Sequence, residues 1–505
     1  MPPSQERTVR LSVVILVLNG KDALIETLDS IRSIADEIIV IDAGAKDGSR
    51  EAALRRGATL IDHTWQDSFA MARNHGLSQV TGDWVLWLDV GEILTEDDAC
   101  QLRTYIDQGP DKNNAWMMLV KVPVRPAAVS AEQVGQIRLV PNLPKIRFSG
   151  RVREDLILSL EAQRINVEGL PWAIHRGVRE HDHTYKTHRA RRDLRLARRQ
   201  IEELGPAARW LLCIGESLQI LGEYEQAAES FRQAVELSEK GSPEMLEAYY
   251  GLLTALEADP RGREIQLSVC LAALGVFPLD AQLLCAMGGY LQAQQRLDLA
   301  AQSYETAFQH GRVNPLTWHI DEVHEIAAVC LSLALQGLNQ RKKACRWLEE
   351  ACAKFPDSNR LRRALLELSV KLGRCDKALG LLDSEVEDSL QVDLLRDVVR
   401  GACLASQKDW TAAKGFLLKA YQAGCADVLC LRWLCLTLFS LGETEAVRPI
   451  LAQWRMLVPA DTDAAKMVEK FSRAPASEEF MPRNRTSQNP QNFQHPTSRL
   501  HPSAS

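Results

Sequence analysis

The sequence has no Cys-x-x-Cys pair, although it contains twelve cysteines among 505 residues. A zinc knuckle or a thioredoxin-like redox site needs closely spaced cysteines, so neither has support. Eleven of the cysteines lie from Cys213 to Cys435, mostly at apolar positions of helical patterns. This placement predicts buried free thiols in a reducing cytosol.

Long hydrophobic runs and an excess of basic residues are also missing. The run Leu11–Leu18 is too short for a membrane span and has no small-residue cleavage site behind it. The chain has 60 Lys and Arg against 66 Asp and Glu, whereas a nucleic-acid or anionic-membrane partner favours a basic surplus. We therefore expect a cytoplasmic protein with no transmembrane segment and no nucleic-acid partner.

The first part of the chain alternates short apolar runs with helical patterns. Strands are predicted at Leu11–Leu18, Glu37–Asp42, Thr59–Asp62 and Trp84–Asp89, and helices at Asp22–Ile34, Ser49–Arg56 and Phe69–Ser78. This alternation is typical of an α/β domain with a mostly parallel sheet, in which ligands bind at the carboxyl ends of the strands. Three strands end in polar residues, Asn19, Asp42 and Asp89, so we expect a site there.

From about Ala207 the chain is helical and repetitive. Ala344, Ala378, Ala412 and Ala446 are each 34 residues apart, with bulky residues about four positions after the alanine. This period, with small residues where helices cross, resembles the tetratricopeptide repeat. Four alanines in register disfavour the alternative, an irregular helical bundle. A stacked array of helix pairs forms a superhelix whose concave face binds proteins or peptides.

Each of three polar segments in the first part permits two interpretations. Asp42 either stabilises a Gly-containing turn before a helix capped near Asp47 or Ser49, or accepts hydrogen bonds from a nucleotide base or ribose. Arg73 is either a solvated side chain or a partner for phosphate oxygens. Asp89 and Glu92 either hold a divalent cation that bridges a diphosphate or cap the following helix.

Together these segments resemble the family-2 glycosyltransferases, which have the GT-A fold, and in particular the bacterial subgroup joined to tetratricopeptide repeats. The matching segments lie in order at 17–20, 42–49, 67–74 and 82–92, and continue at 138–142, 146–150 and 174–177. The resemblance implies a nucleotide-sugar donor, most simply a UDP-sugar, and transfer to an acceptor hydroxyl with inversion. The acceptor would be a glycan, a protein or a lipid-linked molecule.

The resemblance also implies roles for single residues. Asn19, Asp42 and Asp47 would line the base and ribose pocket, and Arg73 would lie near the pyrophosphate. Asp89 would be the first acid of the Asp-x-Asp element. The catalytic base would be a carboxylate after that strand, for which Glu154 and its neighbour Asp155 are the candidates. A Mg²⁺ or Mn²⁺ ion would take its ligands from Asp89, Glu92 and His175.

The chain departs from the family pattern at three positions. Gly91 stands in place of the second acid of Asp-x-Asp, and Gly20 stands in place of the acid that follows Asn19. Arg153 replaces the His of a Gly-x-Ile-His-Glu element. These changes put metal dependence in question and support an alternative, a decayed transferase domain that serves with the repeats as a protein-binding scaffold. Glu154 has an alternative too, a surface ion pair with Arg151 or Arg153.

A basic stretch follows the matching segments. Residues 175–199 contain nine Lys or Arg and four His. The stretch is either a solvated helix that links two domains or, through Arg176, Arg179 or Lys186, a phosphate-facing surface. We therefore expect a GT-A domain at 8–185, a basic helical linker at 186–206, an all-α tetratricopeptide-repeat superhelix at 207–460 that binds a partner or acceptor, and a disordered tail at 472–505.

Overall fold

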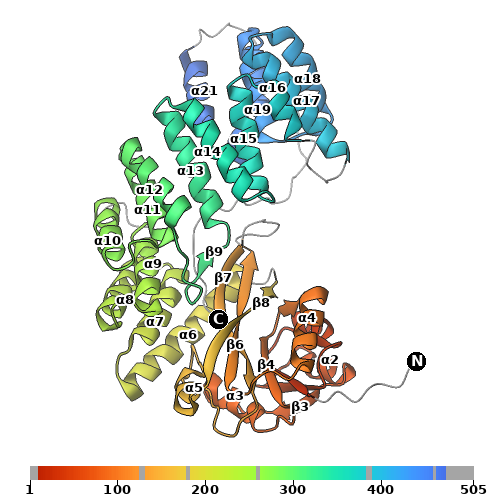
Figure 1. Cartoon of the computed structure of the whole chain (residues 1–505), viewed down its shortest axis with the longest axis vertical. Coiled ribbons are helices and arrows are strands. Elements are labelled where there is room, and N and C mark those ends of the chain that lie inside the picture. The colour runs from red at the N-terminus through yellow and green to blue at the C-terminus, as the bar shows by residue number, and fades with distance from the viewer. Residues whose placement is uncertain are drawn as a thin grey trace, which may run out of the picture. The chain divides into compact units, whose positions relative to one another are not determined.

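A computed structural model of the chain describes residues 9–123, 131–177, 182–257, 262–382, 389–458 and 462–473 (Figure 1). The described residues form two compact units. The first contains the chain through Gln295 together with Thr306–His324, and the second contains Arg296–Glu305 and the chain from Glu325 onward. The predicted tail lies outside the described residues from 474 on. Among the described residues, no helix is both long enough and apolar enough to cross a membrane.

A mixed sheet forms the centre of the first unit. Its strands run in the order β3-β2-β1-β4-β7-β6-β8-β5. These strands are β1 (Leu11–Val17), β2 (Glu37–Asp42), β3 (Thr59–Asp62), β4 (Trp84–Asp89), β5 (Glu92–Leu94), β6 (Asn114–Pro123), β7 (Ala131–Pro141) and β8 (Asn166–Arg176). The first four are parallel, as predicted, but β7 joins β4 in antiparallel orientation. The carboxyl ends of β1, β2 and β4 therefore meet at one edge.

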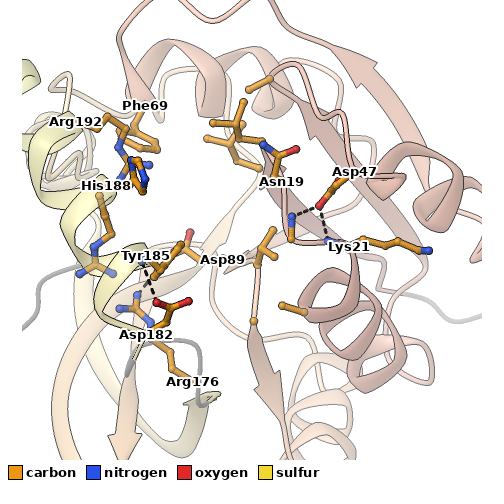
Figure 2. Close-up of a pocket in the computed structure, with 18 of the residues that line it drawn as sticks. Asn19, Lys21, Asp47, Phe69, Asp89, Arg176, Asp182, Tyr185, His188 and Arg192 are labelled. Atoms are coloured by element: carbon orange, nitrogen blue, oxygen red, sulfur yellow. Dashed lines mark hydrogen bonds and ion pairs between the residues drawn. The ribbon is translucent and has the colours of Figure 1, made fainter.

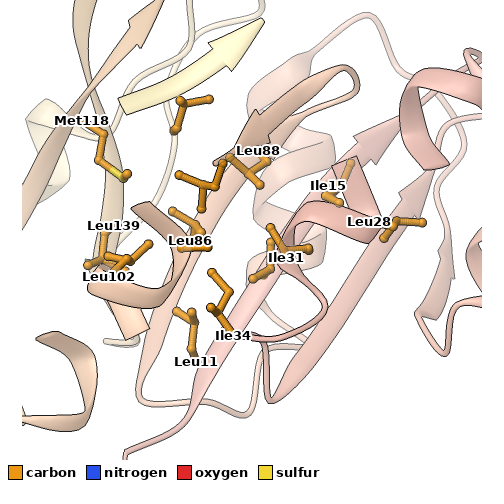
Figure 3. Close-up of a cluster of buried hydrophobic side chains, with 14 of the residues drawn as sticks. Leu11, Ile15, Leu28, Ile31, Ile34, Leu86, Leu88, Leu102, Met118 and Leu139 are labelled. Carbon is orange, nitrogen blue, oxygen red and sulfur yellow. The ribbon is translucent and has the colours of Figure 1, made fainter. Parts of the chain in front are cut away.

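The apolar residues of these strands explain why the edge is rigid. Side chains of β1 and β4 pack against α1 (Lys21–Ile31) and α4 (Glu96–Asp107), as Figure 3 shows for Ile15, Leu86, Leu28 and Leu102. All four side chains are fully or almost fully buried. Burial of one such side chain stabilises the fold by about 1.5–3 kcal/mol, so the strand ends are held by a continuous core.

Helices of the repeat region share a hydrophobic core with the sheet domain within the first unit. They are α6 (His183–Leu204), α7 (Ala208–Ile220), α8 (Tyr224–Leu237), α9 (Pro243–Glu257) and α10 (Gly262–Val276). Helix α11 (Ala281–Ala293) also belongs to the first unit. Val152 belongs to the same buried cluster as Leu212 of α7, and Trp65 and Phe69 pack against it. Gly215 lies where a Cβ atom would approach Phe231 within 2.7 Å, so the helices meet at a position that only glycine fits.

A short strand from the helical region also joins the sheet. Strand β9 (His319–Ile320) pairs antiparallel with β7, and Asp321 accepts a hydrogen bond from the backbone N–H of Ala131. Nothing in the local sequence pattern predicts this strand, because two residues carry no periodicity.

The second unit is helical throughout its described residues. It contains most of α12 (Leu297–His310) and α13 (Val323–Gly337), then α14 (Arg341–Lys354), α15 (Asn359–Lys371), α16 (Cys375–Gly380), α17 (Ser389–Ser406), α18 (Trp410–Gln422), α19 (Val428–Ser440), α20 (Thr444–Leu457) and α21 (Thr462–Arg473). All twelve cysteines of the chain are free thiols.

The alanine repeat is real but not in strict register. Ala344 and Ala378 are fully buried on α14 and α16. On α18 the buried residue is Ala413 rather than Ala412, and on α20 it is Val447 rather than the exposed Ala446. The prediction that the four alanines occupy equivalent positions was therefore wrong by one residue in the last two repeats. The spacing of equivalent helices lengthens by one residue between α16 and α18.

Candidate functional site

A cavity of about 1270 Å³ opens at the carboxyl ends of the parallel strands (Figure 2). Three groups of side chains line it. The loop wall comprises Asn19, Gly20, Lys21 and Asp47; the floor comprises Arg73, Asp89, Glu154 and Arg176; the α6 wall comprises Tyr185, His188, Arg189, Arg192 and Arg195. In Figure 2, Asp89 lies between Asn19 and Asp47 on one side and His188 on the other. The structure thus brings together four of the predicted nucleotide-site residues and Glu154.

Hydrogen bonds tie the loop wall together. Asp47 accepts hydrogen bonds from the backbone N–H groups of Gly20, at 2.5 Å, and Lys21, at 2.9 Å. Asn19 accepts one from the backbone N–H of Lys46 at 3.0 Å. Desolvation disfavours the charged form of Asp47, but the hydrogen bonds that the carboxylate accepts outweigh this effect and lower the pKa of Asp47. Gly20 has φ 113°, a conformation that residues with a side chain rarely adopt.

Asp42 lies beneath the turn rather than on the cavity lining. Its Oδ1 accepts hydrogen bonds from the backbone N–H groups of Gly44, at 2.8 Å, and Ala45, at 2.7 Å. Its Oδ2 pairs with Arg50 at 2.5 Å, and the side chain is almost fully buried. These contacts match the turn interpretation of the sequence, and the contact of Asp42 with a base stays a prediction.

The floor is a network of alternating charges. Arg73 donates from Nη2 to Asp89 at 2.8 Å and from Nε to Glu154 at 2.6 Å. Arg176 lies 3.3 Å from Asp89 and 2.9 Å from Glu92. Arg138 of β7, behind the floor, donates to Glu92 at 2.7 Å. Burial disfavours the charged form of Asp89, yet the three guanidinium groups outweigh this effect and lower its pKa.

Arg73 is a buried residue and not the solvated side chain that one interpretation of the sequence expected. It lies on α3 (Phe69–Leu77), and its guanidinium lies 5.5 Å from the ring centroids of both Trp87 and Phe148. Its Nη1 atom is buried and has no hydrogen-bond partner among the described residues. The contact of this group with a pyrophosphate stays a prediction.

The two candidate bases lie in different surroundings. Glu154 lines the cavity with only 10% of its side chain exposed, and its partner is Arg73. Burial raises the pKa of the Glu154 carboxyl, although Arg73 works in the opposite direction. Asp155 is absent from the cavity lining and forms an ion pair with Arg209 of α7. The geometry therefore favours Glu154 as the group that faces a substrate.

The alternative of a surface ion pair for Glu154 was wrong. Arg151 pairs with Glu203 of α6 at 2.7 Å. Arg153 points into the repeat helices, where it pairs with Glu216 of α7 and, at 2.8 Å, with Glu247 of α9. Arg153, which stands where the resembling family has a His, therefore connects the segment that carries Glu154 to helices α7 and α9.

The predicted metal ligands do not converge on one point. His175 is in register with Ile93, whereas its neighbour Arg176 is in register with Glu92, so alternation along β8 places His175 on the opposite face. Gly91 offers no side-chain ligand, and the Asp89 and Glu92 oxygens already accept from guanidinium groups. No group of three His, Cys, Asp or Glu suited to a metal occurs among the described residues. The described residues therefore do not form a site that fits a divalent cation.

The sequence indicated that α6 is basic, but it did not predict that this helix lines the cavity. Tyr185, His188, Arg192 and Arg195 recur at three- and four-residue spacing, the signal that places them on one helix face. The Arg192 guanidinium lies 4.7 Å from the Phe69 ring centroid. Of the expected phosphate-facing residues, Arg176 is on the floor, Lys186 is absent from the lining, and Arg179 falls outside the described residues.

Comparison with known proteins places the chain in context. Residues 12–121 match the family model described as glycosyl transferase family 2. The chain is 32% identical over 172 residues to a TPR repeat-containing protein of Synechococcus elongatus, a match that covers 32% of this chain and 40% of that protein. An uncharacterized glycosyltransferase of Haemophilus influenzae is 25% identical over 151 residues, covering 27% of this chain and 51% of that protein.

These matches span about half or less of each curated relative. Among solved structures, a tetratricopeptide repeat protein from Parabacteroides merdae aligns with a TM-score of 0.40 at 13% identity, covering 52% of this chain and 97% of that chain. The match of residues 12–121 coincides with the strands that carry the loop wall and Asp89. The chain thus combines an N-terminal α/β domain that matches the glycosyl transferase family 2 model with a largely helical region that resembles tetratricopeptide-repeat proteins.

Proposed function

We propose that the chain transfers a sugar from a nucleotide-sugar, in the first instance a UDP-sugar, to an acceptor hydroxyl. The observation that carries this proposal is the cavity itself, in which Asp89 and Glu154 share Arg73 at the carboxyl ends of the parallel strands. Ligands of open α/β sheets bind at this edge. The loop wall would receive the base and ribose, and the acceptor would enter between the floor and α6.

In this proposal Glu154 is the general base. The acceptor oxygen passes its proton to Glu154 and bonds to the anomeric carbon, while the bond from that carbon to the diphosphate oxygen breaks and its electron pair leaves with the diphosphate. Attack from the face opposite the leaving group inverts the anomeric configuration. A buried carboxylate with a raised pKa suits this role, because it holds the proton more strongly than an exposed one.

The functional domain in this proposal includes α6 and does not end at residue 185, because five residues of the α6 wall line the cavity. The repeats beyond it would bind the acceptor or a protein partner, since stacked helix pairs present a concave surface for such ligands.

A panel of nucleotide-sugars tests the proposal, with release of free nucleotide as the measurement. We expect release with one donor class and loss of release in Glu154→Gln. If no donor is turned over, the second candidate gains support, a non-catalytic domain that works with the repeats as a binding scaffold. Gly91 and the engagement of Asp89 by arginines favour that candidate. Trp65 lines the cavity, so tryptophan fluorescence on titration with UDP separates a nucleotide-binding protein from a scaffold that has lost the pocket.

A further inference from the structure

Both carboxylates at the end of β4 already accept hydrogen bonds from guanidinium groups, and one of them also accepts from a backbone N–H. Asp89 receives Arg73 on Oδ1 at 2.8 Å and Arg176 on Oδ2 at 3.3 Å. Glu92 receives Arg138 at 2.7 Å and Arg176 at 2.9 Å on Oε1, and the backbone N–H of Asp89 at 2.7 Å on Oε2. These are the only two acids in the segment from 89 to 92, because Val90 and Gly91 lie between them.

Both oxygens of Asp89 could chelate a divalent cation only if Arg73 and Arg176 moved away. Mg²⁺ needs oxygen ligands at about 2.0–2.1 Å, so it cannot share an oxygen face with a bound guanidinium. Arg138 and Arg176 are each about 5% exposed and lie on the interior strands β7 and β8. Displacing either one would leave a buried charge without its partner, which is strongly unfavourable.

The floor network cannot by itself neutralise a diphosphate. Its arginines Arg73 and Arg176 are balanced by Asp89 and Glu154, and behind the floor Arg138 is balanced by Glu92. Additional positive charge comes from the α6 wall, where Arg192 and Arg189 share Asp193 and Arg195 pairs with Asp67. On this side, three arginines of α6 and one acid, Asp182, line the cavity.

We infer that this cavity binds the diphosphate of its nucleotide without a divalent cation, with guanidinium groups of the floor and of α6 in its place. The inference rests on the proposed function. Arg73 of the floor and Arg192 of the α6 wall both line the cavity. The buried Nη1 of Arg73 lacks a partner among the described residues. Arg192 is 31% exposed, and its guanidinium lies over the Phe69 ring at the wall of the cavity.

Calorimetric titration of the full-length chain with UDP, GDP, ADP and dTDP tests the inference. The titrations are run in excess EDTA and again in saturating MgCl₂ or MnCl₂. We expect the tightest nucleotide to bind with the same affinity in both conditions, within about twofold. Electron paramagnetic resonance of Mn²⁺ in the presence of that nucleotide gives a second readout, and we expect no stoichiometric protein-bound ion.

Nucleotide binding that requires the cation, or that strengthens about tenfold or more with it, would overturn the inference while leaving the proposed function intact. Absence of nucleotide binding in every condition would contradict the proposed function and the inference together.

A matched pair of variants identifies the group on α6. Arg192→Ala should weaken binding of the nucleoside diphosphate about tenfold and leave binding of the corresponding nucleoside unchanged, because only the former carries the charge. Arg191→Ala is the control, since Arg191 is exposed on the same helix and absent from the cavity lining. Equal losses for nucleoside and diphosphate, or equal effects of the two variants, would remove Arg192 from the diphosphate site.

Discussion

Arg73 donates a hydrogen bond of 2.6 Å to Glu154, although 81 positions separate the two residues in the sequence. The same guanidinium donates to Asp89 at 2.8 Å. One buried arginine therefore connects the strand-end acid of the proposed donor site with the proposed base. This connection sets the distance between the two carboxylates and makes both sensitive to the position of α3.

The proposed base is tested by Glu154→Gln, which preserves the shape of the side chain but cannot accept the proton. We expect turnover to fall about 100-fold or more with little change in nucleotide affinity. The measurement is nucleotide release under saturating donor, with UDP titration as the binding control. Asp155→Asn is the matched variant, and it should retain most activity because Asp155 faces Arg209. The reverse pattern would transfer the role to Asp155, and wild-type rates in both variants would rule out either residue.

The pH dependence of turnover gives an independent test of the same residue. The base acts in its deprotonated form, so turnover should rise with pH as Glu154 loses its proton. Burial raises the pKa of Glu154, so this rise should lie above the ordinary glutamate range of about 4.3. A profile measured from acid to neutral pH checks this expectation. A rise centred at or below the ordinary value would indicate that another, more exposed acid controls the rate.

Asp89→Ala should abolish nucleotide-sugar binding while the chain stays folded. Asp89 holds Arg73 and Arg176 at the floor, and its side chain is 28% exposed, so its loss disturbs the site more than the core. UDP titration measures the first effect and circular dichroism the second. Glu96→Ala, an exposed acid at the start of α4, is the control and should behave as wild type. Unchanged UDP affinity in Asp89→Ala would remove Asp89 from the site.

Arg153→Ala should destabilise the first unit. The substitution leaves Glu216 and Glu247 as buried carboxylates without the cation between them, a change that costs about 3–5 kcal/mol in comparable buried pairs. The midpoint of thermal unfolding should fall by several degrees. Arg232→Ala removes an exposed ion pair with Glu229 and should cost less than about 1 kcal/mol. Equal effects of the two variants would show that Arg153 does not fasten the segment of Glu154.

Truncation after Arg199 should give an aggregation-prone protein without transferase activity. It removes Trp210, which contacts Gly150, and Leu212, which belongs to the same buried cluster as Val152. The exposed apolar surface would promote self-association. Size-exclusion chromatography measures this outcome. A monodisperse, active monomer would show that the sheet domain and the repeats fold independently.

Local patterns were sufficient for the first four strands and the first three helices. The alternation of apolar runs predicted β1 to β4 and α1 to α3 within a few residues, since buried strands and amphipathic helices each impose their own period. The polar ends of β1 and β4 located the cavity for the same reason, because parallel strands present their carboxyl ends at one edge. The alanine spacing identified the repeats but missed a one-residue shift, since adjacent apolar residues such as Ala412 and Ala413 look alike in sequence.

Long-range packing decided the remaining features. The partners of Glu154, Asp155 and Arg153 lie on α3, α7 and α9, at separations for which no periodicity exists. The α6 wall became part of the cavity only because the helix packs against the sheet domain through the shared core around Val152 and Leu196. Sequence spacing reports which face of an element is apolar, whereas the partner of a charged side chain depends on which distant element buries it.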